Sequence, residues 1–178
     1  MKKVLILHTG GTIGMSSDDK NMKTTDVQEL FLEAVPELSK LARIDVLIAD
    51  NIDSSQVTPK HWVKWLQALK NQYHKYDGFV VTHGTDTMSY TGSAFSFAMG
   101  TTTKPVILTG SQRPLRKLRT DAKDNLINSV EMAVSGPPEV AICFGNRLMR
   151  ATRTTKLSAT DYVAFETYNY PELAHFGL

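Results

Sequence analysis

The chain opens with the apolar run Val4-Leu5-Ile6-Leu7, which leads directly into the glycine-rich turn His8-Thr9-Gly10-Gly11-Thr12-Ile13-Gly14. A second apolar run, Gly78-Phe79-Val80-Val81, leads in the same way into His83-Gly84-Thr85-Asp86-Thr87-Met88. Short apolar runs of this kind are typical of buried parallel strands. In an open parallel sheet, the turns that follow the strands lie along one edge, where ligands bind. We therefore expect hydroxyls, a carboxylate and bare glycine backbone to meet in one crevice suited to hydrolytic chemistry on a small polar molecule.

Strand and helix patterns alternate along the chain. We expect strands over Lys3–Leu7, Arg43–Ala49, Phe79–Thr82, Pro105–Thr109 and Glu139–Phe144, and helices over Thr25–Val35, Pro59–Gln72, Thr87–Met99 and Thr120–Ser135. This alternation predicts an α/β fold with an open, mostly parallel sheet between two helix layers, flavodoxin-like or Rossmann-like. Beyond about Arg147 the pattern becomes polar, and Ala151–Lys156 is compatible with an extended arm.

The composition is that of an ordinary globular domain. The 178 residues are 42% hydrophobic and 21% charged, with a net charge of +2, which favours neither a nucleic-acid nor a membrane partner. The one cysteine, Cys143, lies in an apolar strand and is expected to be a buried thiol. No apolar stretch is long enough to span a bilayer or to form a signal sequence, so we expect a cytoplasmic location.

Each predicted strand is followed by small, hydroxyl-bearing or amide-bearing residues. These segments are Thr9-Gly10-Gly11-Thr12, Asp50–Ser55, His83–Asp86, Gly110-Ser111-Gln112 and Gly145-Asn146-Arg147. One polar loop is weak support for a site, because most surface loops are polar. Five such loops on the same edge of one sheet are a stronger signal.

A threonine hydroxyl becomes a good nucleophile only when a base removes its proton or the alkoxide is stabilised. His8 and His83 end strands and are candidates to line the pocket, although a structural hydrogen-bonding role is the more frequent one for such histidines. Lys156 is the other candidate base if it is desolvated and paired with Asp86. The residues alone do not separate Lys156 from a solvated lysine.

Other readings of the motifs fail. The turn Gly10–Gly14 lacks both the G-x-G-x-x-G spacing of dinucleotide sites and the lysine of a P-loop, so neither cofactor is expected. No Cys/His cluster has metal-ligand spacing, so we expect no metal. The basic residues after Gln112 have no interleaved aromatics, which argues against a nucleic-acid groove.

The two glycine turns resemble the signature turns of the bacterial-type L-asparaginases. Further blocks match that family in order, namely Asp53-Ser54-Ser55, Thr109-Gly110-Ser111-Gln112, and Asn146-Arg147-Leu148 through Arg153-Thr154-Thr155-Lys156. The sequence Asp53-Ser54-Ser55 resembles the cytoplasmic type I branch. The resemblance covers essentially the whole chain and implies hydrolysis of L-asparagine to L-aspartate and ammonia without a cofactor.

The resemblance also implies roles for individual residues. Thr12 matches the nucleophile that forms an acyl-enzyme, while Thr85, Asp86 and Lys156 match a second catalytic triad. Asp86 further matches the group that holds the substrate ammonium. The matching substrate-binding residues are Asp53, Ser54, Ser55, Thr85 and Asp86. Family members are homodimers or homotetramers at full length.

Two departures from the family pattern stand out. The loop Met15–Thr25, a candidate lid on composition, contains no tyrosine, whereas family members usually carry one there. Family members also continue into a second, smaller α/β domain, so residues 1–178 are expected to be the N-terminal domain alone, with little turnover in isolation. Three alternatives stay open: the asparaginase-like subunit of a glutamyl-tRNA amidotransferase, a preference for L-glutamine, and a non-catalytic flavodoxin-like module that binds amino acids.

Overall fold

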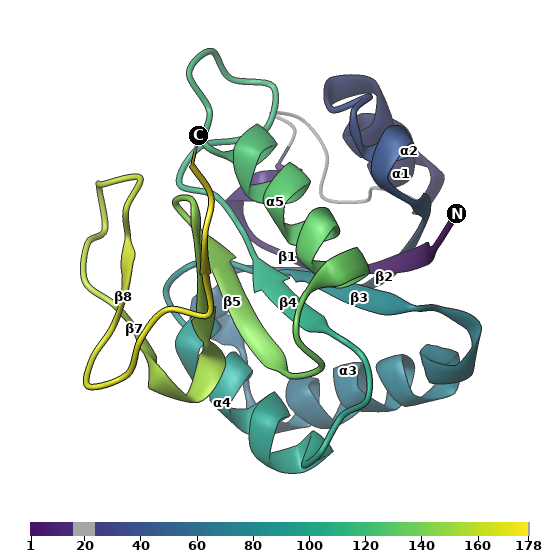
Figure 1. The fold of residues 1–178 in the computed structure, drawn as a ribbon. Helices are drawn as coiled ribbons and strands as arrows, with labels where there is room; N and C mark the ends of the chain where they lie inside the picture. The colour runs from purple at the N-terminus through teal and green to yellow at the C-terminus, as the bar shows by residue number, and fades with distance from the viewer. Residues whose placement is uncertain (16–23, 178) are drawn as a thin grey trace.

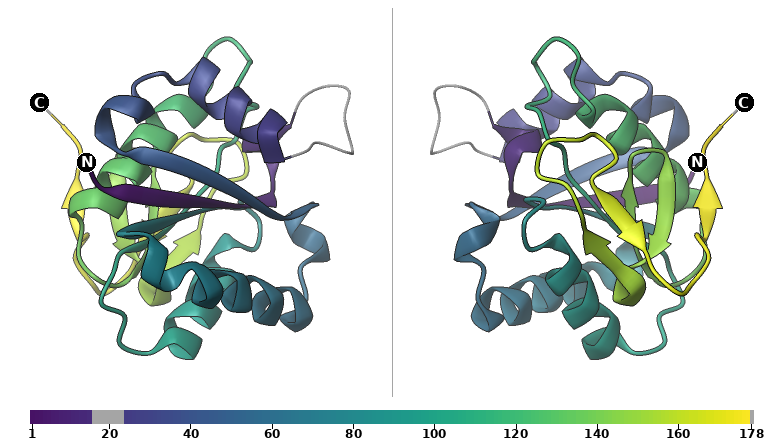
Figure 2. Two further views of the ribbon diagram at one scale, coloured as in Figure 1. Left: turned by 90° about the vertical axis from the view of Figure 1, so that its right-hand side faces the viewer. Right: turned by 90° about the vertical axis from the view of Figure 1, so that its left-hand side faces the viewer.

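The computed structural model describes residues 1–15 and 24–177, which form one large sheet between two layers of helices (Figure 1; Figure 2). The sheet has the strand order β2-β1-β3-β4-β5-β6-β9. Its strands are β1 (Lys3–Gly10), β2 (Arg43–Ile52), β3 (Gly78–Thr82), β4 (Val106–Thr109), β5 (Val140–Phe144), β6 (Arg147–Arg150) and β9 (Ala174–His175). The first five are parallel, and β6 and β9 continue the sheet in antiparallel fashion.

The helices lie on both faces of this sheet. In Figure 1, α1 (Thr24–Ala34), α2 (Leu38–Leu41) and α5 (Ala122–Ser135) lie above the strands, and α3 (Pro59–Gln72) and α4 (Met88–Met99) lie below them. Alternate residues of β1 face the two layers: Val4 and Ile6 pack with α1 and α5, whereas Leu5 and Leu7 pack with α3 and α4. Because a strand covered on both faces buries every side chain, it reads as a continuous apolar run.

The clearest predicted helix, α3, has the predicted bounds. It begins at Pro59 after Thr58 and buries Trp65 and Leu69 against the sheet. The Trp65 indole nitrogen donates to the Asp50 carboxylate at 2.6 Å, which ties α3 to the end of β2. The five parallel strands and the other three predicted helices are also present, with bounds that differ from the prediction by a few residues.

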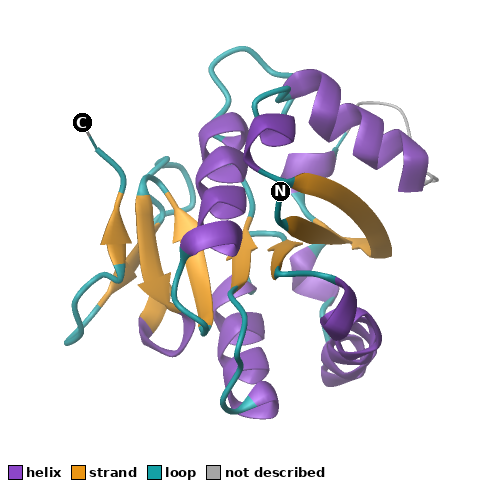
Figure 3. Cartoon of the chain, turned by 45° about the vertical axis from the view of Figure 1, so that its right-hand side comes forward, coloured by secondary structure: helices purple, strands orange, loops and turns teal. Residues whose placement is uncertain are grey.

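The chain beyond Phe144 differs from the predicted extended arm. Ala151–Arg153 is one turn of 3-10 helix (η4), and Thr154–Lys156 is the strand β7, paired antiparallel with β8 (Phe165–Thr167). Figure 3 shows the strands that follow α5 gathered on the side of the molecule that bears the C-terminus. The short strands β6–β9 have little periodicity of their own, and long-range pairing forms them.

Two expectations from the sequence concerned the single cysteine and membrane-spanning segments. Cys143 is fully buried in β5, and burial raises the pKa of its thiol to about 12, so the thiol stays protonated at neutral pH. Within residues 1–15 and 24–177, none of the helices is long and apolar enough to cross a bilayer.

The strand order explains where ligands bind. In a sheet of order 2-1-3-4-5, the connection after β1 runs toward β2 and the connection after β3 runs the opposite way toward β4, so a crevice is expected between the carboxyl ends of β1 and β3. The loops after these two strands are the two glycine turns. The remaining short 3-10 turns include η1 (Thr12–Gly14) and η2 (Ser54–Gln56) on this edge, and η3 (Tyr73–Lys75) after α3.

Candidate active site

Two glycines bring the loops after β1 and β3 into direct contact. Gly11 lies so close to the second loop that a Cβ atom on it would sit 2.5 Å from the Gly84 backbone nitrogen. Gly11 also has a φ of 84°, a conformation that costs glycine no steric energy. Thr12 follows Gly11 and Thr85 follows Gly84, so the two threonines extend from touching backbone segments.

The loops after β2 and β4 join the same contact. A Cβ atom on Gly84 would sit 2.6 Å from the Ser54 hydroxyl oxygen, and the Thr87 hydroxyl donates to the Ser54 carbonyl at 2.7 Å. A Cβ atom on Gly110 would sit 2.3 Å from the His83 carbonyl oxygen. Four of the five polar loops predicted from the sequence therefore form one continuous surface at the carboxyl edge of the sheet.

Lys156 reaches this surface from β7. Its Nζ donates to the Thr85 hydroxyl at 2.7 Å and to the Asp86 carboxylate at 2.6 Å. The Lys156 side chain is 16% exposed and that of Asp86 is 66% exposed, so the ammonium is largely buried while the carboxylate opens to solvent. A lysine held against a threonine hydroxyl and a carboxylate is an arrangement that can move a proton to or from the hydroxyl.

Thr12 begins η1 and is partly exposed, while Ile13 beside it is buried and anchors the turn in the core. Within the described parts of the chain, the Thr12 hydroxyl has no hydrogen-bond partner, so its oxygen is open to a small molecule in the crevice. Most of the predicted lid, Met15–Thr25, lies outside the described residues, which omit 16–23.

The two serines of the predicted carboxylate-binding segment differ in their contacts. Ser54 is buried against Gly84, whereas the Ser55 hydroxyl and backbone nitrogen donate to the Asp53 carboxylate at 2.6 and 2.8 Å. These hydrogen bonds hold the pKa of Asp53 below its usual value. Ser54 thus lies with the threonine loops, while Asp53 and Ser55 bond to each other and form the start of η2.

Both strand-end histidines have structural roles. The His8 Nδ1 lies 2.7 Å from the Thr82 hydroxyl, and the His83 Nε2 lies 2.9 Å from the Thr91 hydroxyl. Each ring is almost fully buried, and desolvation lowers the pKa of both His8 and His83 to about 4. Both rings are neutral at pH 7 and face the interior, which supports the structural reading over a histidine-based triad.

Comparison with known proteins agrees with this geometry. Residues 3–177 match the family "Asparaginase, N-terminal", almost the full length of the chain. The chain belongs to this asparaginase family.

Asparaginases of this family resemble the chain in both sequence and structure. The chain is 41% identical to L-asparaginase 1 of Escherichia coli K12, over 99% of the chain and 54% of that protein. The structure of L-asparaginase I from Vibrio cholerae superposes with a TM-score of 0.89 at 41% identity, over 99% of the chain and 54% of its own. A glutamyl-tRNA(Gln) amidotransferase component from Thermococcus kodakarensis is 41% identical over 95% of the chain and 41% of its length. The chain therefore spans about half the length of these two asparaginases.

Sequence reasoning gave no individual role to Gln112, Asp121 and Asn125, which adjoin the site. The Asp121 carboxylate accepts from the Gln112 backbone nitrogen at 2.8 Å, and the Asn125 amide donates to the Gly110 carbonyl at 3.0 Å. The Gln112 Oε1 accepts from the Thr85 hydroxyl at 3.3 Å. Two sequence signals point to these residues: Gln112 is an amide that closely follows a strand, and Asp121 and Asn125 are polar residues four positions apart at the start of a helix.

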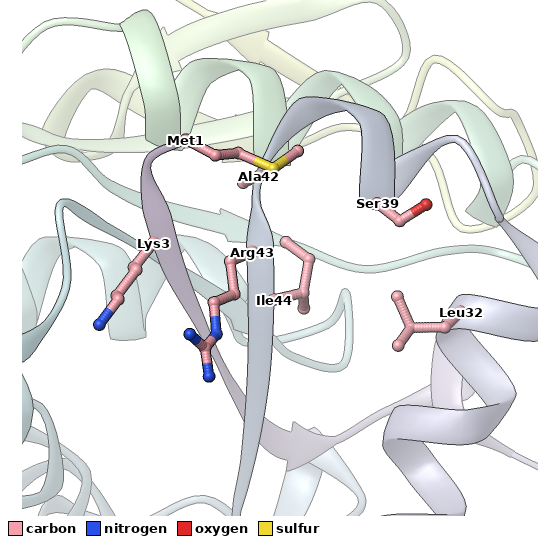
Figure 4. A pocket seen from close by; sticks show the side chains of 7 residues that line it. All are labelled: Met1, Lys3, Leu32, Ser39, Ala42, Arg43 and Ile44. Carbon is pink, nitrogen blue, oxygen red and sulfur yellow. The ribbon is translucent and has the colours of Figure 1, made fainter.

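A second hollow lies at the opposite, amino-terminal edge of the sheet (Figure 4). In this view Lys3 and Arg43 point to one side of β2, while Leu32, Ser39 and Ile44 lie on the other. Its charged side chains point away from its apolar side chains, and its lining has no threonine and no carboxylate. The chemistry of the described residues is concentrated at the carboxyl edge.

Proposed function

We propose that this chain forms the hydrolytic half of an amidohydrolase that converts L-asparagine into L-aspartate and ammonia. The single observation that carries the proposal is the contact of Lys156 with both Thr85 and Asp86, beside the loop that bears Thr12. A binding module needs a hydroxyl and an acid to hold an amino acid, but it has no need of a largely buried lysine on that hydroxyl. Membership of the asparaginase family supports the same reaction.

In this proposal Thr12 is the nucleophile. Its oxygen attacks the side-chain carbonyl carbon of asparagine, and the tetrahedral oxyanion is stabilised by backbone N–H groups of the glycine turns. The proton that Thr12 loses passes to the nitrogen of the breaking C–N bond, so ammonia leaves and an aspartyl ester remains on Thr12. Thr85 with Lys156 then activates a water molecule, which cleaves the ester and releases L-aspartate.

The substrate is a zwitterion and needs one fixed acid together with several donors. Asp86 is the proposed partner of the α-ammonium, because its carboxylate is exposed beside Thr85. Ser54, with Asp53 and Ser55 forming the turn around it, is the proposed binding segment for the α-carboxylate. Ser54 is the stronger candidate of the two serines, since the Ser55 hydroxyl is already bonded to Asp53.

The proposal assigns residues 1–178 to the N-terminal α/β domain of such an enzyme. The chain spans 54% of the Escherichia coli and Vibrio cholerae proteins, which supports a requirement for further protein in full turnover. We propose that the complete enzyme is a cytoplasmic homodimer or homotetramer, on the resemblance of Asp53-Ser54-Ser55 to the cytoplasmic branch.

The test is ammonia release from L-asparagine by the full-length protein. We expect turnover in the unaltered enzyme and its loss in the Thr12→Ala variant, with L-aspartate still bound by that variant in calorimetry. Absence of turnover from the unaltered enzyme, or full activity of Thr12→Ala, would contradict the proposal. Binding of L-aspartate without any acyl transfer to hydroxylamine would favour the non-catalytic module instead.

A second candidate function rests on the 41% identity to the amidotransferase component. In that case the same threonines would release ammonia for a partner protein instead of into solution. Turnover of free L-asparagine without any partner or tRNA favours the asparaginase. Hydrolysis that begins only with a charged tRNA and a partner protein favours the amidotransferase, and faster turnover of L-glutamine would revise the substrate.

A further inference from the structure

Gln112 links the proposed catalytic threonine to the segment that carries its lysine. The Gln112 Nε2 donates to the carbonyls of Asp161 and Ser158 at 3.1 and 3.4 Å. Both carbonyls can only accept, so the amide nitrogen must face them and the amide oxygen must face the other way. The Gln112 Oε1 then accepts the Thr85 hydroxyl proton at 3.3 Å.

The direction of the hydrogen bonds at Thr85 follows from this orientation. The Lys156 Nζ donates to the Thr85 oxygen at 2.7 Å, so that oxygen is the acceptor. The single Thr85 proton is therefore directed to Gln112. The result is a chain of donors that runs from Lys156 through Thr85 and Gln112 to the loop 158–161, with the rotation of the Thr85 hydroxyl fixed.

The backbone at Gln112 is hydrogen-bonded to Asp121, the residue that precedes α5. The Gln112 backbone nitrogen and that of Arg113 donate to the two Asp121 carboxylate oxygens at 2.8 and 3.0 Å. The Asn125 side chain is 2% exposed. Its amide nitrogen donates to the Asp121 carboxylate at 3.3 Å, and its amide oxygen accepts from the Gly145 backbone nitrogen at 3.1 Å. A polar network anchored on a buried asparagine fixes a side chain more tightly than a solvated loop would.

Lys156 pairs with Phe165, which is buried in the core, and Gln112 adds a link to the loop that follows Lys156. Lys156 ends β7, which pairs with β8 in a separate two-stranded sheet and not with the seven-stranded one. The loop between β7 and β8 is hydrogen-bonded to the main body by Gln112 and by the Tyr162 hydroxyl, which donates to the Arg119 carbonyl at 2.6 Å and accepts from Arg113 at 3.5 Å. Ala164, at the end of this loop, is buried in the core. Of these two side chains, Gln112 is the one that also contacts Thr85.

We propose that Gln112 is a positioning residue, which sets the Thr85 hydroxyl and holds the β7–β8 loop so that Lys156 meets Thr85. This inference rests on the proposed amidohydrolase function, but it concerns a residue that acts through Thr85 and Lys156 and not on the substrate itself.

The test compares two variants of the full-length protein. Gln112→Met keeps the length of the side chain and removes all three of its side-chain hydrogen bonds. Gln112→Glu keeps an acceptor for Thr85, turns an oxygen toward the loop carbonyls and places a negative charge near Lys156. The matched controls are Gln67→Met and Gln67→Glu, on the exposed face of α3.

Three readouts follow, namely kcat and KM for L-asparagine, the pH profile of kcat, and amide hydrogen exchange over residues 157–163. We expect Gln112→Met to lower kcat about tenfold or more with little change in KM, and to speed exchange in the loop. Gln112→Glu should change the pH profile of kcat, because it adds a carboxylate beside Thr85 and Lys156. The Gln67 variants should match the unaltered protein.

Unchanged loop exchange in Gln112→Met, or a Gln112→Glu pH profile identical to that of the unaltered enzyme, overturns the proposal. If Gln112→Met does not fold, Gln112→Glu carries the test through both exchange and profile. If the unaltered protein releases no ammonia, the proposed function falls. Loop exchange, which needs no turnover, then still decides whether Gln112 holds the segment of Lys156.

Discussion

At the scale of single residues, Lys156 has an environment that differs from that of an ordinary surface lysine. It is largely buried, and it donates to Thr85 and Asp86 at once. The ion pair itself adds little to stability, since Asp86 is 66% exposed and water screens the interaction. Its value is in positioning, because it fixes a proton donor at hydrogen-bond distance from a threonine hydroxyl.

We therefore predict that Lys156→Met separates activity from stability. The variant should lose kcat for L-asparagine by about 100-fold or more, which is the range of general acid–base catalysis. Its free energy of unfolding in urea should change by less than about 1 kcal/mol. Lys60→Met, on the exposed start of α3, is the matched control and should retain full turnover. A Lys156→Met enzyme with kcat within a few-fold of normal would remove the lysine from the mechanism.

At the scale of elements, the site depends on close contact between loops. The Gly11 backbone touches the Gly84 backbone, and Gly84 touches Ser54, so any side chain on these glycines would push the loops apart. Because Thr12 follows Gly11 and Thr85 follows Gly84, this contact sets the distance between the two threonines. The geometry of the crevice is thus set by residues that carry no functional group.

Gly11→Ala tests this contact against Gly100→Ala. Both glycines have positive φ, 84° and 58°, but a Cβ atom on Gly100 meets nothing within 4 Å. Gly100→Ala should cost about 1–3 kcal/mol of unfolding free energy for its backbone conformation alone, because residues with a side chain rarely adopt φ 58° and ψ −129°. Gly11→Ala should cost clearly more and abolish turnover, because the β1 and β3 loops must separate. Equal unfolding free energies and equal activities for the two variants would show that the loop contact is unimportant.

Elements with their own periodicity could be predicted from the sequence. The stripe of Trp62, Trp65 and Leu69 defined α3, and the apolar run at Val4–Leu7 defined β1. Strands β6 to β9 were missed because each has two to four residues and forms only by pairing with distant chain. Lys156 could not be singled out from the residues alone for the same reason, since its partner Thr85 lies 71 positions away. The resemblance to the asparaginases supplied what the local pattern lacked.

At the scale of the whole molecule, the sheet is stabilised by a core on each face, and both buried histidines lie where β1 and β3 end beside the crevice. His8 borders the layer of α1 through an edge-to-face contact with Phe31, and His83 borders the layer of α3 through one with Trp65. Neither ring can take up a proton without a charge being buried. Acid therefore acts on the global stability of the fold through these two positions.

The sign of this pH dependence follows from the pKa of each histidine, about 4 in the folded chain and 6.5 as the ordinary value. Between these values the unfolded chain binds more protons, so the free energy of unfolding falls as the pH drops from about 6.5 to 4. Each histidine contributes up to roughly 3 kcal/mol to this loss.

Urea unfolding at pH 7 and pH 4.5 measures this loss. We expect a smaller difference between the two pH values in His8→Asn and in His83→Asn than in the unaltered protein. His74→Asn, at an exposed position, should leave the difference unchanged. An identical loss in all four proteins would mean that other groups cause the acid sensitivity.

The central claim is that the hydroxyls of Thr12 and Thr85 face one small molecule across the crevice between β1 and β3. The most direct measurement is a crystal structure of the full-length protein with L-aspartate bound. The account predicts that the side-chain carboxylate of the ligand contacts both hydroxyls, with its ammonium on Asp86. A ligand bound elsewhere, or one that touches only one of the two threonines, would contradict it.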